Sequence, residues 1–167
     1  MDYSIDFASL ELGEYRFDFK IDESLFQEFG NQDILGADIS LSVDLLKEER
    51  VLTLTLDFKG MINLLCDRCL DPLELKVSGI KTLFIKFGEE NTQEIDNIIF
   101  ISDRENEIDL SQQIYEYILL QKPMKCVHEI SECNSDIIDI LTTTTTREDN
   151  NKSIDPRWDA LRNIKLD

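Results

Sequence analysis

The sequence predicts an α+β fold dominated by antiparallel strands, arranged as a sheet or as a partly open barrel, with a few packing helices. Two observations carry this prediction. Several segments alternate apolar and polar residues, the pattern of a strand with one buried face, and two others repeat apolar residues at helical spacing. With 167 residues, 42% of them hydrophobic, the chain is long enough to bury one core.

The first half of the chain is predicted to form a strand, a short helix and a hairpin. Residues 15–21 alternate apolar and charged side chains, and residues 22–29 carry cap residues followed by apolar residues at helical spacing. Residues 37–45 and 51–58 alternate again across the short polar connection 47–50. An antiparallel hairpin is the simplest arrangement for these two strands.

The second half leads into two cysteine clusters. A strand after Gly60 runs into Cys66-Asp-Arg-Cys69, and strands over residues 73–77 and 82–87 follow, so the first pair of thiols should sit at a hairpin tip. A short strand at 98–101 precedes a helix with Asp109 at its cap. That helix should pack over the sheet, and the chain after it should lead into the second cysteine cluster.

Three segments are expected along the chain. Residues 1–141 should form a single α+β domain that includes the cysteines. The threonine-rich tract 142–153 has nothing to bury and reads as a flexible linker. Residues 154–167 should form a C-terminal helix anchored by Trp158, with Pro156 at its first turn.

Charge limits the classes of partner. Seventeen basic residues against thirty-five acidic ones give a formal net charge of -18, which attracts basic proteins and repels nucleic acid and other polyanions. The chain has no signal segment and no apolar run long enough to cross a membrane, so we expect a cytoplasmic protein with no membrane partner. In that compartment the cysteines should stay reduced.

The cysteines and the single histidine form the strongest chemical signal. Five potential metal ligands fall in two clusters, Cys66 and Cys69 in one and Cys126, His128 and Cys133 in the other. Two such clusters predict one structural zinc per chain and a zinc-knuckle-like end to the domain. The fourth ligand could be either Cys126 or His128, and Leu70 stands where such knuckles usually have glycine. Four reduced, partly buried thiols are the alternative, and a redox pair is disfavoured because no helix starts at Cys66.

No catalytic site is expected. The sequence has no glycine-rich phosphate loop and no nucleophile elbow, and its one histidine already belongs to a cysteine cluster. We therefore predict that the protein is not an enzyme and has no catalytic residues. The segment with Arg157, Trp158 and Arg162 is one of the few that are not acidic. It is a candidate contact for a partner, and an ordinary salt-bridged helix face is the alternative.

Four motifs in this order resemble the YceD family of large ribosomal RNA subunit accumulation proteins, in the form found in the Bacteroidetes. They are Cys66-Asp-Arg-Cys69-Leu, Ile114-Tyr-Glu-Tyr-Ile-Leu-Leu120, the His128 to Cys133 segment and Asp155-Pro-Arg-Trp158. The resemblance covers nearly the whole chain. One departure is Gln121-Lys122-Pro123, where many members of the family have Leu-Pro.

This resemblance implies both a ligand set and a role. Its metal ligands would be Cys66, Cys69, His128 and Cys133, with Cys126 left out. It further implies a part in 23S ribosomal RNA synthesis or processing, with no catalytic activity, and in many bacteria the gene lies beside that of a basic zinc-ribbon protein of the large subunit. With the acidic charge, we expect a non-enzymatic accessory factor that binds a basic large-subunit ribosomal protein or a pre-ribosomal particle. The alternative is a metal-stabilised protein that binds or processes RNA directly.

Overall fold

The computed structural model describes residues 3–88, 97–102 and 104–148. The fold is α+β and mostly antiparallel, as predicted, and its main sheet is open rather than closed into a barrel. The chain divides into two compact units, Met1–Val127 and His128–Asp167. Among the described residues, no helix is both long and apolar enough to cross a membrane.

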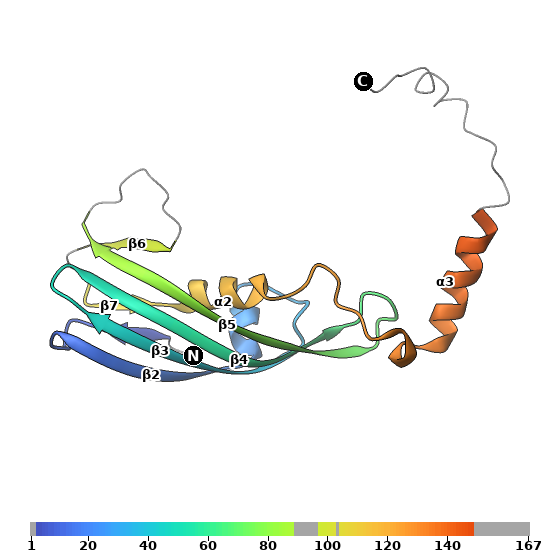
Figure 1. The fold of residues 1–167 in the computed structure, drawn as a ribbon, viewed down its shortest axis with the longest axis horizontal. Coiled ribbons are helices and arrows are strands. Elements are labelled where there is room, and N and C mark those ends of the chain that lie inside the picture. The colour runs from blue at the N-terminus through green and yellow to red at the C-terminus, as the bar shows by residue number, and fades with distance from the viewer. Residues whose placement is uncertain (1–2, 89–96, 103, 149–167) are drawn as a thin grey trace, which may run out of the picture. The chain divides into compact units, whose positions relative to one another are not determined.

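The first unit is built on a five-stranded sheet in the order β2-β3-β4-β5-β6, in which β2 to β5 lie side by side (Figure 1). Strands β2 to β5 pair antiparallel with one another, whereas β6 runs parallel to β5. The strands are β2 (Gly13–Ile21), β3 (Gly36–Lys47), β4 (Val51–Leu65), β5 (Pro72–Phe87) and β6 (Ile98–Ile101).

Alternation along the strands places one face of the sheet in the core. On β3 the inward side chains Ile39, Leu41, Val43 and Leu45 are at most 2% exposed, while the residues between them are polar. On β4 the inward positions from Leu52 to Phe58 repeat the pattern. The predicted hairpin is confirmed, since Lys47 pairs with Leu52 and the Glu48 N–H donates to the Val51 carbonyl at 3.0 Å.

The strands around Gly60 and Gly79 are longer than predicted. The alternation had indicated separate strands on either side of each glycine, but β4 and β5 pass through without a break. Gly60 pairs with Ile39, and a Cβ on Gly60 would lie only 2.2 Å from the Asp38 carbonyl oxygen. Without a side chain there, β3 and β4 can approach closely and the ladder continues.

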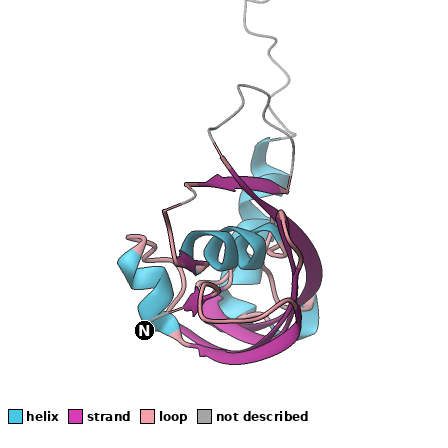
Figure 2. Cartoon of the chain, turned by 90° about the vertical axis from the view of Figure 1, so that its left-hand side faces the viewer, coloured by secondary structure: helices cyan, strands magenta, loops and turns pink. Residues whose placement is uncertain are grey.

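Two helices cover the inward face of the sheet. Figure 2 shows the strands curving around helix α2 (Ser111–Leu120). Helix α1 (Glu23–Glu28) packs beside it, where the Phe29 and Tyr115 rings stack with their centroids 4.5 Å apart. The carboxylate of Asp22 caps α1 by accepting a hydrogen bond from the Ser24 N–H at 2.9 Å.

The predicted start of α2 needs a correction. Asp109 belongs to β7 (Glu107–Asp109), which pairs with β1 (Ser4–Asp6) in a small second sheet that the sequence did not reveal. The residue at the helix cap is Leu110, with no side-chain hydrogen bond to the helix. The Asp109 carboxylate instead accepts from the Ser111 N–H at 2.9 Å, and the Gln112 side chain donates to Glu116.

The second unit contains a 3-10 turn, η1 (Ile130–Glu132), followed by helix α3 (Ser135–Glu148). Residues 142–148 are helical, although the predicted linker begins at 142, so the helix runs further than expected. The hydroxyls of Thr142 and Thr143 donate to the carbonyls of Ile138 and Asp139, four residues back, which satisfies them within the helix. The linker role of 142–153 and the domain boundary at 141 stay predictions, and the expected helix at 154–167 lies outside the described residues.

Candidate metal centre

The first cysteine pair lies in the loop between β4 and β5, at the predicted hairpin tip. The Cys66 N–H donates to the Asp71 carbonyl at 2.9 Å, and the Leu70 N–H returns to the Cys66 carbonyl at 2.9 Å. Within this turn the Arg68 N–H donates to the Cys66 sulfur at 3.4 Å. This hydrogen bond helps to fix the position of the Cys66 sulfur within the turn.

Leu70 adopts the backbone conformation that glycine normally supplies after a knuckle's second cysteine. Its φ of 62° is in the left-handed region, and its side chain is 70% exposed. The absence of glycine from the motif therefore does not prevent the turn from forming. We call residues 66–71 the knuckle.

The chain returns to the knuckle after α2 through a pair of hydrogen bonds between Asp67 and Cys126. The Asp67 N–H donates to the Cys126 carbonyl at 2.8 Å, and the Cys126 N–H donates to the Asp67 carboxylate at 2.6 Å. Neither motif spacing nor composition pointed to Asp67. The only signal in the sequence is its place between two ligand candidates.

The environment of Cys126 differs from that of the other cysteines. All four cysteines are buried, but Cys126 alone among them packs in the hydrophobic core cluster, and its sulfur lies 3.5 Å from the Pro123 carbonyl oxygen. Burial raises the pKa of the Cys126 thiol. The negative charge of Asp67 also raises this pKa, whereas the positive charge of Lys122 lowers it.

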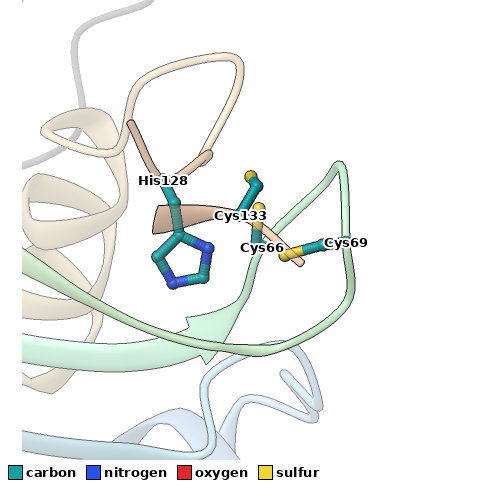
Figure 3. A group of neighbouring side chains, drawn as sticks. All are labelled: Cys66, Cys69, His128 and Cys133. Atoms are coloured by element: carbon teal, nitrogen blue, oxygen red, sulfur yellow. The ribbon is translucent and has the colours of Figure 1, made fainter. Parts of the chain in front are cut away.

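The four side chains implied by the family resemblance lie close together. The sulfurs of Cys66, Cys69 and Cys133 and a ring nitrogen of His128 are all within 4.8 Å of one another (Figure 3). The three cysteines are buried and form no disulfide, and His128 is partly buried. Cys126 is not in this group, whereas Arg157, Trp158 and Arg162 lie outside the described residues.

This donor set fits zinc. Three thiolates and one imidazole are a common structural zinc shell, and metal–ligand bonds of about 2.0–2.3 Å in a tetrahedron would separate the ligand atoms by roughly 3.3–3.8 Å. The ligand atoms, within 4.8 Å of one another, would need to contract only slightly. Four protein ligands fill a tetrahedron, so the chemistry of such a site is structural rather than catalytic.

Comparison with protein families finds a match over most of the chain. The model of the large ribosomal RNA subunit accumulation protein YceD matches residues 54–165, which is more than half of the chain and includes all five candidate ligands. Comparison with curated proteins and with solved structures gives no match.

Proposed function

Because this chain belongs to the YceD family of large ribosomal RNA subunit accumulation proteins, we propose that it is a non-enzymatic accessory factor in large ribosomal subunit biogenesis that binds a basic ribosomal protein. The observation that carries the choice of partner is the net charge of -18. Such a charge speeds association with cationic proteins and opposes contact with RNA phosphates.

Zinc has a structural part in this proposal. One zinc bound by Cys66, Cys69, His128 and Cys133 would tie the knuckle to residues far along the chain. Because the unfolded chain holds no such site, the free energy of binding zinc adds to the stability of the folded state. The metal supplies this cross-link and takes no part in a reaction.

The partner surface that we propose is the acidic helical face, defined as Asp22, Glu23, Glu28, Asp109 and Glu116. These residues lie on or beside α1 and α2, which pack against each other. Ion pairs between described residues join other groups, namely Arg16 with Asp18 and Asp44, and Lys20 with Asp38, on β2 and β3. The carboxylates of the acidic helical face thus have no Lys or Arg ion-pair partner in the described part of the chain.

Two further features support a cationic ligand on this face. Burial raises the pKa of Tyr3, and the negative charges of Asp22 and Glu28 raise it further, as expected where the local potential is negative. Phe29, which is 39% exposed, stacks on Tyr115 between the two helices. An aromatic side chain beside carboxylates suits the guanidinium of arginine, because the ring and the carboxylates both attract the cation.

Matched charge variants test this proposal. Replacing Glu23, Glu28 and Glu116 with Gln should weaken binding to purified basic proteins of the large subunit by about tenfold or more at roughly 0.1 M salt. Replacing Asp18, Asp38 and Asp44 with Asn changes the net charge equally on the sheet and should have a much smaller effect.

Ribosomal RNA fragments titrated in parallel distinguish the alternative. The proposal expects weak or no binding of RNA by the isolated protein. Tight RNA binding at physiological salt, with no affinity for the basic proteins, would overturn it in favour of direct RNA binding.

A further inference from the structure

We infer that Asp67 is a positioning residue for the proposed zinc site and holds the chain segment that leads to His128 in place before metal binds. This inference rests on the proposed zinc site. It concerns the two hydrogen bonds between Asp67 and Cys126, which join segments 59 positions apart in the sequence. We call this pair of hydrogen bonds the Asp67 clamp.

The geometry of the clamp favours a strong interaction. The main chain of Asp67 donates to the Cys126 carbonyl, and its carboxylate accepts from the N–H of the same residue, so both backbone groups of Cys126 are satisfied by one partner. The second bond, at 2.6 Å, has an anionic acceptor. Hydrogen bonds to charged acceptors are shorter and stronger than neutral ones.

Each partner of the clamp is itself held in place. Asp67 lies between Cys66 and Cys69 in a turn closed by the bonds from Cys66 to Asp71 and from Leu70 to Cys66. Cys126 is fixed by its buried side chain, which packs in the hydrophobic core. None of these contacts involves His128 or Cys133, so the clamp does not depend on these two ligands being in place.

The consequence for the site follows from chain connectivity. Only Val127 separates Cys126 from His128, and two residues span at most roughly 7 Å. Fixing Cys126 at the knuckle therefore confines His128 to its neighbourhood, which lowers the entropy that metal binding must remove. Cys126 serves as the anchor of this segment and not as the fourth ligand.

Zinc affinity in matched variants tests the role of Asp67. In competition with a chromogenic chelator, Asp67→Ala should weaken zinc binding about 10- to 100-fold, the usual effect of removing a group that supports a metal ligand. Asp67→Asn keeps an oxygen acceptor and should recover part of the affinity. Asp71→Ala removes a carboxylate from the same turn and should leave the affinity close to that of the wild-type protein.

Two spectroscopic measurements separate positioning from a general loss of structure. In chelator-treated protein the Cys126 amide hydrogen should exchange slowly, and Asp67→Ala should accelerate its exchange while the amides of β3 and β4 stay protected. In cobalt-substituted protein, Cys126→Ala should leave the intensity of the sulfur-to-cobalt charge-transfer band unchanged, because that intensity follows the number of Co–S bonds.

The inference is overturned if Asp67→Ala binds zinc as tightly as the wild-type protein, or if Cys126→Ala loses one Co–S bond. A wild-type protein that binds no zinc refutes the proposed zinc site instead. In that case the exchange of the Cys126 amide alone still decides whether Asp67 holds the segment.

Discussion

Leu70 shows that the knuckle forms even where its sequence does not favour it. A left-handed backbone costs a residue with a Cβ roughly 1–2 kcal/mol, and Leu70 has a φ of 62°. In this conformation its N–H reaches the Cys66 carbonyl at 2.9 Å and closes the turn. Since the side chain is 70% exposed, its burial in the monomer offsets little of this cost.

Replacing Leu70 with glycine should therefore stabilise the protein. The relieved strain exceeds the entropy that glycine adds to the unfolded chain, which leaves a gain of about 0.5–1 kcal/mol in the free energy of unfolding. Leu35→Gly is the control, because Leu35 is similarly exposed, at 57%, but has a negative φ. That variant should be destabilised, and chemical denaturation of both compares them. A Leu70→Gly protein no more stable than wild type would argue against strain at this position.

If zinc binds as proposed, replacing Cys69 should affect the stability of the whole protein. Cys69→Ser should release the metal and lower the melting temperature, since the binding energy of structural zinc contributes to folding. Cys126→Ala removes a thiol of the same chemistry and should keep one zinc per chain. Elemental analysis and thermal melts provide the comparison. Protein prepared without chelator that contains no zinc, together with unchanged melting of Cys69→Ser, would refute the zinc site.

At the scale of the elements, the length of β4 and β5 places the knuckle. These strands pair continuously from Val51 with Lys86 to Leu65 with Pro72, so the turn between them lies at the far end of a long hairpin. Gly60 lies within β4, where any side chain would meet the backbone of Asp38 and Ile39. The close approach of β3 and β4 at this point depends on glycine.

Gly60→Ala should consequently disrupt the sheet. The new methyl group cannot be accommodated by rotating a side chain, and overpacking of this kind costs typically about 1–3 kcal/mol. Gly36→Ala is the matched control, because its Cβ would meet only the side chain of Asn63, whose Nδ2 atom is nearest at 3.1 Å. Urea denaturation should show a lower midpoint for Gly60→Ala and a small change for Gly36→Ala. Equal midpoints for the two variants would contradict the close approach.

At the scale of the whole molecule, the net charge of -18 has two opposing effects. Like charges repel within the folded protein and reduce its stability, while the same field attracts a basic partner. Salt screens both interactions, with a Debye length of roughly 10 Å at 0.1 M. The stability of the protein and its affinity for the proposed partner should therefore respond to salt in opposite directions.

Raising sodium chloride from about 0.02 to 0.3 M should raise the melting temperature and weaken partner binding. Neutralising Glu23, Glu28 and Glu116 should reduce both salt dependences, because these residues contribute to the same field. Calorimetry and binding titrations on one preparation measure the two effects. Partner binding that does not change with salt would show that charge is not its main source.

Local patterns in the sequence were enough to predict the α+β class, the hairpin of β3 and β4 and the position of Cys66 and Cys69 at a hairpin tip. Alternation at period two reports directly which face of a strand is buried, and turn residues mark where strands end. The ligand set Cys66, Cys69, His128 and Cys133 came from family resemblance, and the structure brings these side chains together. Zinc binding there stays a prediction.

The tertiary structure alone decided the rest. Pairing of β1 with β7, the continuation of β4 through Gly60 and the bonds between Asp67 and Cys126 all join residues distant in sequence. The same holds for the separation of Cys126 from the other cysteines, since spacing left Cys126 and His128 as equal candidates. In the structure His128 lies in the group with Cys66, Cys69 and Cys133, whereas the Cys126 side chain packs in the hydrophobic core. Local sequence cannot specify such contacts, because their free energy depends on which distant surfaces the fold brings together.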